Sequence, residues 1–292
     1  MGIAVVMSVS RRALLRSAAA TASLTACGRH TLTGKAPTVV PIALLHLAPQ
    51  AGAVAENRSA LLEAIQTAAA AGARWILTPE LCISGYAFAD LIGTDWIEPL
   101  PDGWVATLQT CAREHAVTLF VGLPERDAIT DRLHNTLLAI GPSGQLLGRH
   151  RKIRTITVGS EAWSSPGDEA VPVAAPLLGP VGLLICADAC DSTLATALKA
   201  QGARLLISAA NWAPGQYGPS GEWEECSAES ALPMIVCNRT GVGRTLDFSA
   251  SESVVVCQGE RVLTLSSATP TAFLLQWDRL TGMPVSHTRI DL

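Results

Sequence analysis

A cysteine at the end of an apolar run is the residue with the clearest chemical potential in this sequence. Residues 181–185 read Val-Gly-Leu-Leu-Ile, which is typical of a short buried strand, and Cys186 follows directly. A thiol at a strand end is fixed in position, and the next backbone N–H groups can stabilise an oxyanion. The same pattern is also typical of a core cysteine, because free cysteine is among the most buried residue types. A catalytic role therefore requires a base and a cation elsewhere in the chain.

Three charged residues are candidates for these roles. Glu80 follows an apolar run and Pro79; burial raises the pKa of a carboxyl group, which suits a general base. Lys152 closes the basic run 149–152, and an ammonium group lowers the pKa of a nearby thiol and can stabilise an oxyanion. Glu161 follows in a polar stretch. Each of the three, taken alone, is equally typical of a solvent-exposed charge.

The elements that must position these residues form an alternating pattern. The predicted strands cover residues 39–47, 73–78, 117–123, 134–140, 145–148, 181–185, 203–208, 233–237, 253–257, 261–265 and 271–276, the last of these being the final strand. The predicted helices cover residues 54–71, 102–115, 191–201 and 222–231. Strands alternate with helices and then form hairpins, so the pattern indicates one α/β domain with mixed sheets.

The composition predicts a globular protein with a large core and excludes several other classes of protein. The chain has 292 residues, of which 49% are hydrophobic and 16% charged, so a large core can form. The net charge is −4 and no basic patch with interleaved aromatics occurs, which argues against nucleic-acid binding. The sequence contains no run of about 18 apolar residues, so no membrane span is predicted. None of the eight cysteines has the spacing of a zinc site, so we expect no metal.

The first 36 residues have a different character. The pair Arg11-Arg12 precedes an alanine-rich stretch, as in twin-arginine signal peptides, and residues 24–27 (Leu-Thr-Ala-Cys) are similar to a lipobox. The predicted organisation is a signal peptide at 1–26, a lipidated Cys27 with a tether at 27–36, and a hydrolase domain at 37–292. We expect export to the periplasmic or cell-envelope side, with membrane attachment only through the lipid. The alternatives are an ordinary cleaved signal peptide and a misassigned start.

Six motifs in order resemble the nitrilase superfamily of carbon–nitrogen hydrolases over residues 39–277. The motifs are Thr78-Pro79-Glu80-Leu81 with Gly85-Tyr86, His134-Asn135-Thr136, Gly141 to Gly144 with Gly148 to Ile153, Glu161-Ala162-Trp163 with Pro166-Gly167, Val181 to Asp188, and Ala210-Asn211-Trp212 followed by Asn238-Arg239 and Gly241. The resemblance implies a four-layer αββα sandwich, usually assembled into a homodimer or higher homo-oligomer. It implies a small-molecule amide or nitrile substrate and no metal or organic cofactor.

The resemblance also implies roles for the charged residues. Cys186 would be the nucleophile and Glu80 the general base. Lys152, helped by the backbone N–H of Ala187, would stabilise the oxyanion, and Glu161 would support Lys152 or position the substrate. The residues expected to contact substrate are Tyr86, Trp163, Ala187 and Trp212, with core packing as the alternative for the aromatic ones. Asp188 fits the family pattern and is expected to be structural.

The segment after the cysteine departs from the family. Ala187 stands where many members have an aromatic residue, and no arginine occurs between residues 187 and 203, which argues against N-carbamoyl amino acids as substrates. Ala187-Asp188 favours an amidase over a nitrilase. The function expected is hydrolysis of a small amide through a cysteine thioester, releasing ammonia or an amine. The alternatives are nitrile hydrolysis, acyl transfer by the same residues, and a catalytically silent binding scaffold.

Overall fold

Two packed β-sheets form the centre of the molecule. The computed structural model describes residues 38–292, and all statements below concern these residues. The first sheet has the strand order β13-β12-β1-β2-β3-β4-β5 and the second the order β11-β10-β9-β8-β7-β6. The strands are β1 (Val39–His46), β2 (Trp75–Leu77), β3 (Thr118–Arg126), β4 (Leu133–Ile140), β5 (Leu146–Arg151), β6 (Val173–Ala175), β7 (Gly179–Ile185), β8 (Leu205–Ala209), β9 (Met234–Cys237), β10 (Glu252–Cys257), β11 (Glu260–Ser266), β12 (Thr271–Asp278) and β13 (Met283–Asp291).

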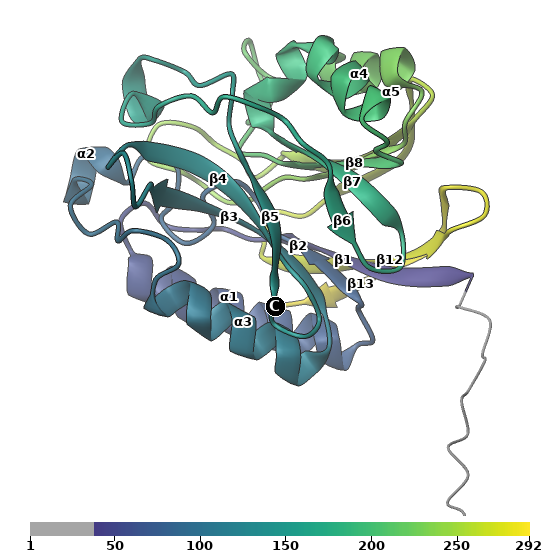
Figure 1. Cartoon of the computed structure of the whole chain (residues 1–292), viewed down its shortest axis with the longest axis horizontal. Helices are drawn as coiled ribbons and strands as arrows, with labels where there is room; N and C mark the ends of the chain where they lie inside the picture. The colour runs from purple at the N-terminus through teal and green to yellow at the C-terminus, as the bar shows by residue number, and fades with distance from the viewer. Residues whose placement is uncertain (1–37) are drawn as a thin grey trace, which may run out of the picture. The chain divides into compact units, whose positions relative to one another are not determined.

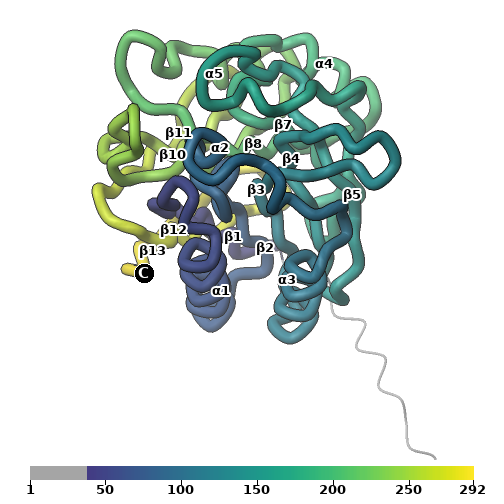
Figure 2. The backbone as a smooth tube through the Cα atoms, turned by 90° about the vertical axis from the view of Figure 1, so that its left-hand side faces the viewer, coloured from purple at the N-terminus to yellow at the C-terminus, as the bar shows by residue number. Residues whose placement is uncertain are grey.

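Helices cover the outer face of each sheet. Figure 1 shows α1 (Val54–Ala70) and α3 (Gly103–His115) on the first sheet, with α4 (Ser192–Ala200) and α5 (Glu222–Ser230) on the second. The view along the other direction shows the same stacking (Figure 2). This arrangement confirms the predicted four-layer αββα sandwich with mixed sheets. The strands between the layers read as nearly continuous apolar runs because both faces of each sheet are buried.

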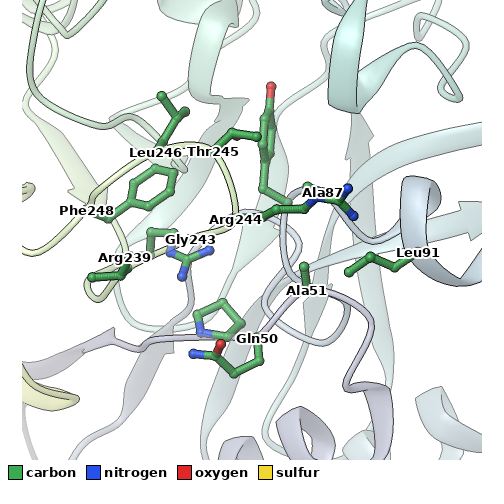
Figure 3. A pocket seen from close by; sticks show the side chains of 13 residues that line it. Gln50, Ala51, Ala87, Leu91, Arg239, Gly243, Arg244, Thr245, Leu246 and Phe248 are labelled. Atoms are coloured by element: carbon green, nitrogen blue, oxygen red, sulfur yellow. The ribbon is translucent and has the colours of Figure 1, made fainter.

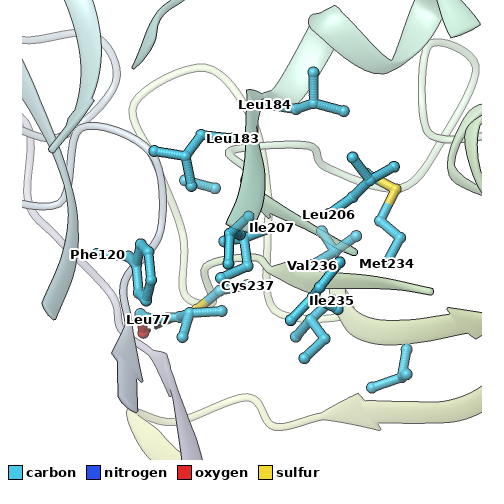
Figure 4. Close-up of a cluster of buried hydrophobic side chains, with 14 of the residues drawn as sticks. Leu77, Phe120, Leu183, Leu184, Leu206, Ile207, Met234, Ile235, Val236 and Cys237 are labelled. Carbon is cyan, nitrogen blue, oxygen red and sulfur yellow. Dashed lines mark hydrogen bonds between the residues drawn. The ribbon is translucent and has the colours of Figure 1, made fainter. Parts of the chain in front are cut away.

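The core between the sheets consists of aliphatic and aromatic side chains that exclude water. Figure 4 shows Phe120 and Leu77 of the first sheet facing Leu183, Ile207 and Cys237 of the second. All five are at most 1% exposed. Their burial supplies the main driving force for joining the two sheets, since free energy scales with the apolar area removed from water.

Parallel strands at the centre of each sheet bring distant residues to one edge. Strands β1, β2 and β3 run parallel to one another in the first sheet, as do β7, β8 and β9 in the second. Glu80 follows β2, Cys186 follows β7 and Asn211 follows β8. The carboxyl ends of neighbouring parallel strands meet at the same edge, so these residues are drawn together.

The C-terminal strand was not expected from the sequence. Strand β13 pairs antiparallel with β12, so the prediction that residues 271–276 are the final strand is wrong. Its residues are mostly exposed and polar, and Pro284 pairs where the register shifts at a bulge. An edge strand of this composition gives no hydrophobic alternation to detect. Two short elements, β6 and α2 (Ala89–Ile92), were also not predicted.

The predicted signal peptide, tether and lipidated Cys27 lie outside the described residues. Within residues 38–292, no helix is long and apolar enough to cross a membrane. The seven cysteines in this part of the chain are all free thiols.

Candidate active site

Glu80 lies in the turn after β2, completely buried between the two sheets' edges. Its Oε2 accepts a hydrogen bond from the backbone N–H of Asn211 (2.9 Å), and its carbonyl oxygen accepts one from the Asn211 side chain (2.8 Å). Gly122 of β3 lets this turn approach closely, because a Cβ there would lie 2.4 Å from the Pro79 carbonyl oxygen. The strand end and these contacts fix the carboxylate in one orientation.

Lys152 places a buried ammonium group between two carboxylates. It follows β5, and its Nζ donates to Glu80 Oε1 and to Glu161 Oε2, each at 2.8 Å. All three side chains are fully buried. Gly167 makes room for the Lys152 turn, since a Cβ at Gly167 would lie 2.4 Å from the Arg151 carbonyl oxygen. Lys152, the last residue of the basic run at 149–152, is therefore buried and not exposed to solvent.

Asn135 joins the two carboxylates and had no role assigned from the sequence. Its Nδ2 donates to Glu80 Oε1 and to Glu161 Oε1, both at 2.7 Å, and its carbonyl oxygen accepts from the Lys152 N–H at 2.8 Å. The residue lies within β4, beside the end of β5. The signal available in the sequence was its place in the His134-Asn135-Thr136 motif, which indicates no function by itself.

Cys186 begins the 3-10 turn η2 (Cys186–Cys190) directly after β7. Its backbone φ is +45°, a left-handed conformation that is rare for a residue with a side chain and recurs at functional sites. Its side chain is nearly buried, at 6% exposed. The charges of Glu80, Lys152 and Glu161 all act on its thiol, so the structure brings the four predicted catalytic residues together.

Asp188 ties the cysteine turn to the segment that follows Lys152. Its buried carboxylate accepts hydrogen bonds from the backbone N–H groups of Ile185, Ile153 and Arg154 at 2.8 to 2.9 Å. It also pairs with His150 Nε2 at 2.8 Å. These contacts connect the ends of β5 and β7, as expected for a structural residue.

Burial and charge set the protonation of the site. Burial raises the pKa of the Cys186 thiol well above its usual value, the charge of Glu80 raises it further, and Lys152 opposes both. Burial lowers the pKa of Lys152, but Glu80, Cys186 and Glu161 outweigh it and hold this pKa well above its ordinary value. Burial and the charge of Glu80 raise the pKa of Glu161. The resting site therefore holds a neutral thiol beside a charged ammonium group.

The predicted substrate-contacting residues have different surroundings. Tyr86 is half-buried and lines a cavity, and burial together with the charges of Glu80 and Glu161 raises the pKa of its hydroxyl. Trp163 stacks edge-on against Phe88 with a centroid distance of 5.0 Å. Trp212 packs edge-on against Trp223 at 5.5 Å, and its Nε1 donates to the Tyr217 carbonyl oxygen. Both tryptophans thus have a packing role, while Ala187 directly follows the cysteine.

No metal-binding cluster accompanies these groups. Across residues 38–292, no group of three or more His, Cys, Asp or Glu side chains is placed to hold a metal ion. The chemistry available from the arrangement is that of a thiol, a carboxylate base and an ammonium group in a site shielded from water.

Comparison with known proteins identifies the family. Residues 41–271 match the carbon–nitrogen hydrolase family, which is most of the chain. The chain belongs to the carbon–nitrogen hydrolase family. The family assignment makes it an enzyme that hydrolyses carbon–nitrogen bonds, and it confirms the resemblance to the nitrilase superfamily.

Individual relatives of this carbon–nitrogen hydrolase include nitrilases and amidases. A nitrilase of Pyrococcus abyssi is 28% identical over 233 residues, covering 79% of this chain and 86% of that protein. The omega-amidase NIT2 of Mus musculus is 32% identical over 182 residues, covering 58% of this chain and 62% of that protein.

Solved structures share the fold of this carbon–nitrogen hydrolase. A mutant of the amidase from Nesterenkonia sp. AN1, with the acetamide moiety of fluoroacetamide added covalently at its active-site cysteine, superposes with a TM-score of 0.73 at 21% identity. The match covers 85% of this chain and 94% of that one. Saccharomyces cerevisiae Nit3 gives a TM-score of 0.72 at 19% identity, covering 82% and 90%.

Proposed function

We propose that this enzyme hydrolyses a small amide through a thioester on Cys186. The observation that carries the proposal is the buried cluster in which Lys152 bridges Glu80 and Glu161 within electrostatic range of Cys186. A thiol with a raised pKa needs a base to become a nucleophile, and the buried carboxylate of Glu80 is that base. The covalent cysteine adduct in the Nesterenkonia amidase supports the same chemistry.

The reaction proceeds in two halves. Glu80 takes the thiol proton as sulfur attacks the amide carbonyl carbon, and Lys152 stabilises the resulting oxyanion together with the N–H of Ala187. Glu80 then gives the proton to the leaving nitrogen, the C–N bond breaks, and ammonia or an amine leaves the thioester. Glu80 next removes a proton from water, which attacks the thioester carbonyl. The C–S bond breaks, and the proton returns to sulfur as the carboxylic acid leaves. Glu161 holds Lys152 in place throughout.

Amide is preferred to nitrile on two grounds. Small Ala187 with Asp188 after the nucleophile fits amidases better than nitrilases. The second ground is the solved Nesterenkonia amidase of the same fold, which carries a covalent adduct at its active-site cysteine. Nitrile hydrolysis and acyl transfer by the same residues remain the alternatives, because both pass through attack by the same thiol.

Matched substrates separate these activities. Ammonia release is measured with butyramide and with butyronitrile, which share an acyl chain, and acyl transfer is followed with added hydroxylamine. We expect kcat/KM at least about tenfold higher for the amide, and Cys186→Ala, Lys152→Ala and Glu80→Gln variants slowed by orders of magnitude. A higher kcat/KM for the nitrile would support the alternative, and full activity in Cys186→Ala would reject the mechanism.

Export with a lipid anchor on Cys27 and assembly into a homodimer or higher homo-oligomer are further parts of the proposal. The twin arginines and residues 24–27 support the first, and the family resemblance supports the second. Labelling with radioactive palmitate in a bacterial host tests the anchor: label should be present in the full chain and absent from Cys27→Ser. Light scattering of the purified protein should give at least twice the monomer mass, and a monomer would reject the predicted assembly.

A further inference from the structure

A cavity of about 430 Å³ lies between the turn after β1 and the loop that follows β9, a size typical of small-molecule sites. Its walls come from that turn, from the turn after Gly85 and from the loop at 239–248 (Figure 3). Within residues 38–292, its lining includes no acidic side chain and none of the four predicted catalytic residues. The cavity is therefore distinct from the catalytic cluster, and its charge comes from arginine.

Arg239 lines this cavity as a buried cation that no carboxylate neutralises. The residue is 1% exposed, and of its side-chain N–H groups only Nε–H has a partner among the described residues, the Thr240 carbonyl oxygen at 3.1 Å. Burial lowers the pKa of Arg239 to about 10, and no carboxylate charge raises it. The guanidinium is thus charged at neutral pH, and an unpaired buried charge is unfavourable unless a ligand pairs with it.

Phe248 fixes the direction of this guanidinium. The guanidinium carbon of Arg239 lies 4.4 Å from the centroid of the Phe248 ring, so one face of the group is covered and its edge stays free. Figure 3 shows the guanidinium beneath this ring and pointing into the cavity. The loop that carries both residues is closed by the Phe248 N–H, which donates to the Gly241 carbonyl oxygen at 2.9 Å. The cation is therefore held in place before any ligand arrives.

Apolar side chains around Arg239 indicate the class of ligand. Leu91 is 50% exposed, Val242 65% and Leu246 45%, and all three line the cavity. Exposed apolar residues gathered at a concave surface are typical of a ligand site. A carboxylate matches the planar fork of a guanidinium, because two parallel N–H···O bonds can form. The combination suits a small organic acid with an apolar body better than a free inorganic ion.

We propose that Arg239 binds the carboxylate of a small organic acid in this cavity, separately from the substrate at Cys186. The carboxylate accepts hydrogen bonds from Nη1 and Nη2, and the apolar body of the acid contacts Leu91, Val242 and Leu246. No step of hydrolysis enters this inference, so it does not rest on the proposed function. A ligand that binds only the folded protein stabilises it, so occupancy of the site should raise the unfolding temperature.

Three probes test the ligand class by calorimetry: hexanoate, its neutral counterpart 1-hexanol, and inorganic phosphate, which has no apolar body. We expect hexanoate to bind at least about tenfold more tightly than either, because charge-assisted hydrogen bonds and apolar burial both contribute. Arg239→Met should weaken hexanoate binding by about tenfold or more. The matched control is Arg204→Gln, an exposed arginine at the start of β8, which should bind as the wild type does. Equal affinity for the three probes, or unchanged binding in Arg239→Met, would overturn the proposal.

Thermal unfolding distinguishes a ligand-binding arginine from a structural one. Methionine keeps the contact with Phe248 and removes an unpaired buried charge, so Arg239→Met should unfold at the wild-type temperature or above it without ligand. Hexanoate at ten times its Kd should raise the wild-type Tm by about 3–6 °C and leave that of Arg239→Met unchanged. A lower Tm of ligand-free Arg239→Met would show that the arginine is structural and would reject the site.

A variant of the catalytic cation locates the bound acid. Lys152→Met removes the ammonium group of the catalytic cluster and should retain hexanoate binding, because the proposed contacts involve Arg239 instead. Circular dichroism confirms that this variant is folded before calorimetry. Binding lost in Lys152→Met but kept in Arg239→Met would place the acid at the active site and overturn the assignment.

Discussion

At the scale of single residues, the thiol of Cys186 depends on its neighbours for activation. Burial and the charge of Glu80 both raise its pKa, and Lys152 and a backbone hydrogen bond from Asn211 oppose them. The resting enzyme therefore keeps the proton on sulfur, and in the proposed mechanism Glu80 receives it only as the substrate is attacked. This differs from thiol enzymes in which a neighbouring cation keeps the cysteine ionised.

The pH dependence of alkylation tests this thiol state. Because the thiolate is the reactive form and the Cys186 pKa is raised, the rate of iodoacetamide modification should keep increasing above pH 9. Tandem mass spectrometry, which localises the label within the peptide that contains both cysteines, measures the rate at Cys186 separately from that at exposed Cys190. Lys152→Met should move the increase to still higher pH, because the ammonium group lowers the thiol pKa. A plateau below pH 7 would show that the resting cysteine is a thiolate instead.

Asn135 is a positioning residue on the same scale. Its amide group holds the carboxylates of Glu80 and Glu161, which would otherwise repel each other in a buried site. Both hydrogen bonds that the Asn135 side chain donates go to these carboxylates, so we expect it to act by positioning them.

Substitution of Asn135 should lower kcat more than it raises KM. We expect about a tenfold loss of kcat in Asn135→Ala and about a hundredfold loss in Asn135→Asp, because a third carboxylate adds repulsion. The pH–rate profile should shift in Asn135→Asp, which a purely structural role would not cause. Steady-state kinetics across pH, with circular dichroism to confirm folding, measure both effects. Unchanged kcat in the two variants would contradict this role.

At the scale of elements, the ends of β5 and β7 are joined by one buried carboxylate. Asp188 accepts backbone hydrogen bonds from both sides of this junction and pairs with His150. These partners outweigh burial and hold the pKa of Asp188 below its usual value. The same turn ends at Asp191, whose side chain caps α4 by accepting from the Thr193 N–H.

Asp188→Asn should destabilise the protein by about 3 kcal/mol, because an amide cannot accept all of these hydrogen bonds. Urea unfolding at pH 7 measures the loss. The native carboxylate has a lowered pKa, so its stabilisation is complete above the ordinary aspartate pKa and is lost as the pH falls toward the native value. The difference between wild type and variant should therefore shrink in acid. A loss below 1 kcal/mol at pH 7 would show that the junction is held by other contacts.

At the scale of the whole molecule, the site exists because two sheets are packed face to face. Glu80, Lys152 and Asn135 come from the first sheet, and Cys186 and Asn211 come from the second. Any loosening between the sheets would separate the thiol from Glu80, its proposed base.

Truncation of a core side chain tests how strongly the packing between the two sheets stabilises the fold. Phe120 is fully buried between the sheets and packs on Trp75 with a centroid distance of 5.1 Å. Phe120→Ala should lower the free energy of unfolding by about 3–5 kcal/mol. Ile129→Ala is the matched control, since Ile129 is 94% exposed, and it should change stability by less than about 0.5 kcal/mol. Similar unfolding midpoints for the two variants in urea would contradict the importance of the interface.

The sequence predicted the strand-end residues better than the residues within strands. Glu80 and Cys186 stood out because an apolar run ends at each, and Lys152 because it follows a hairpin. Asn135 could not be assigned, because its role arises from the pairing of β4 with the end of β5. Strand β13 was missed because its polar residues are ordered by pairing with β12 rather than by burial. Both cases depend on pairing between neighbouring strands, which the hydrophobic pattern of each strand alone does not reveal.

Trapping of the acyl-enzyme tests most directly whether amide hydrolysis passes through a thioester on Cys186. The protein is mixed rapidly with a small amide substrate, quenched in acid and analysed by intact and tandem mass spectrometry. We predict a mass increase equal to the acyl group, located on Cys186 and absent in Cys186→Ala. Amide turnover with no adduct in wild type, or an adduct of the same mass in Cys186→Ala, would contradict it.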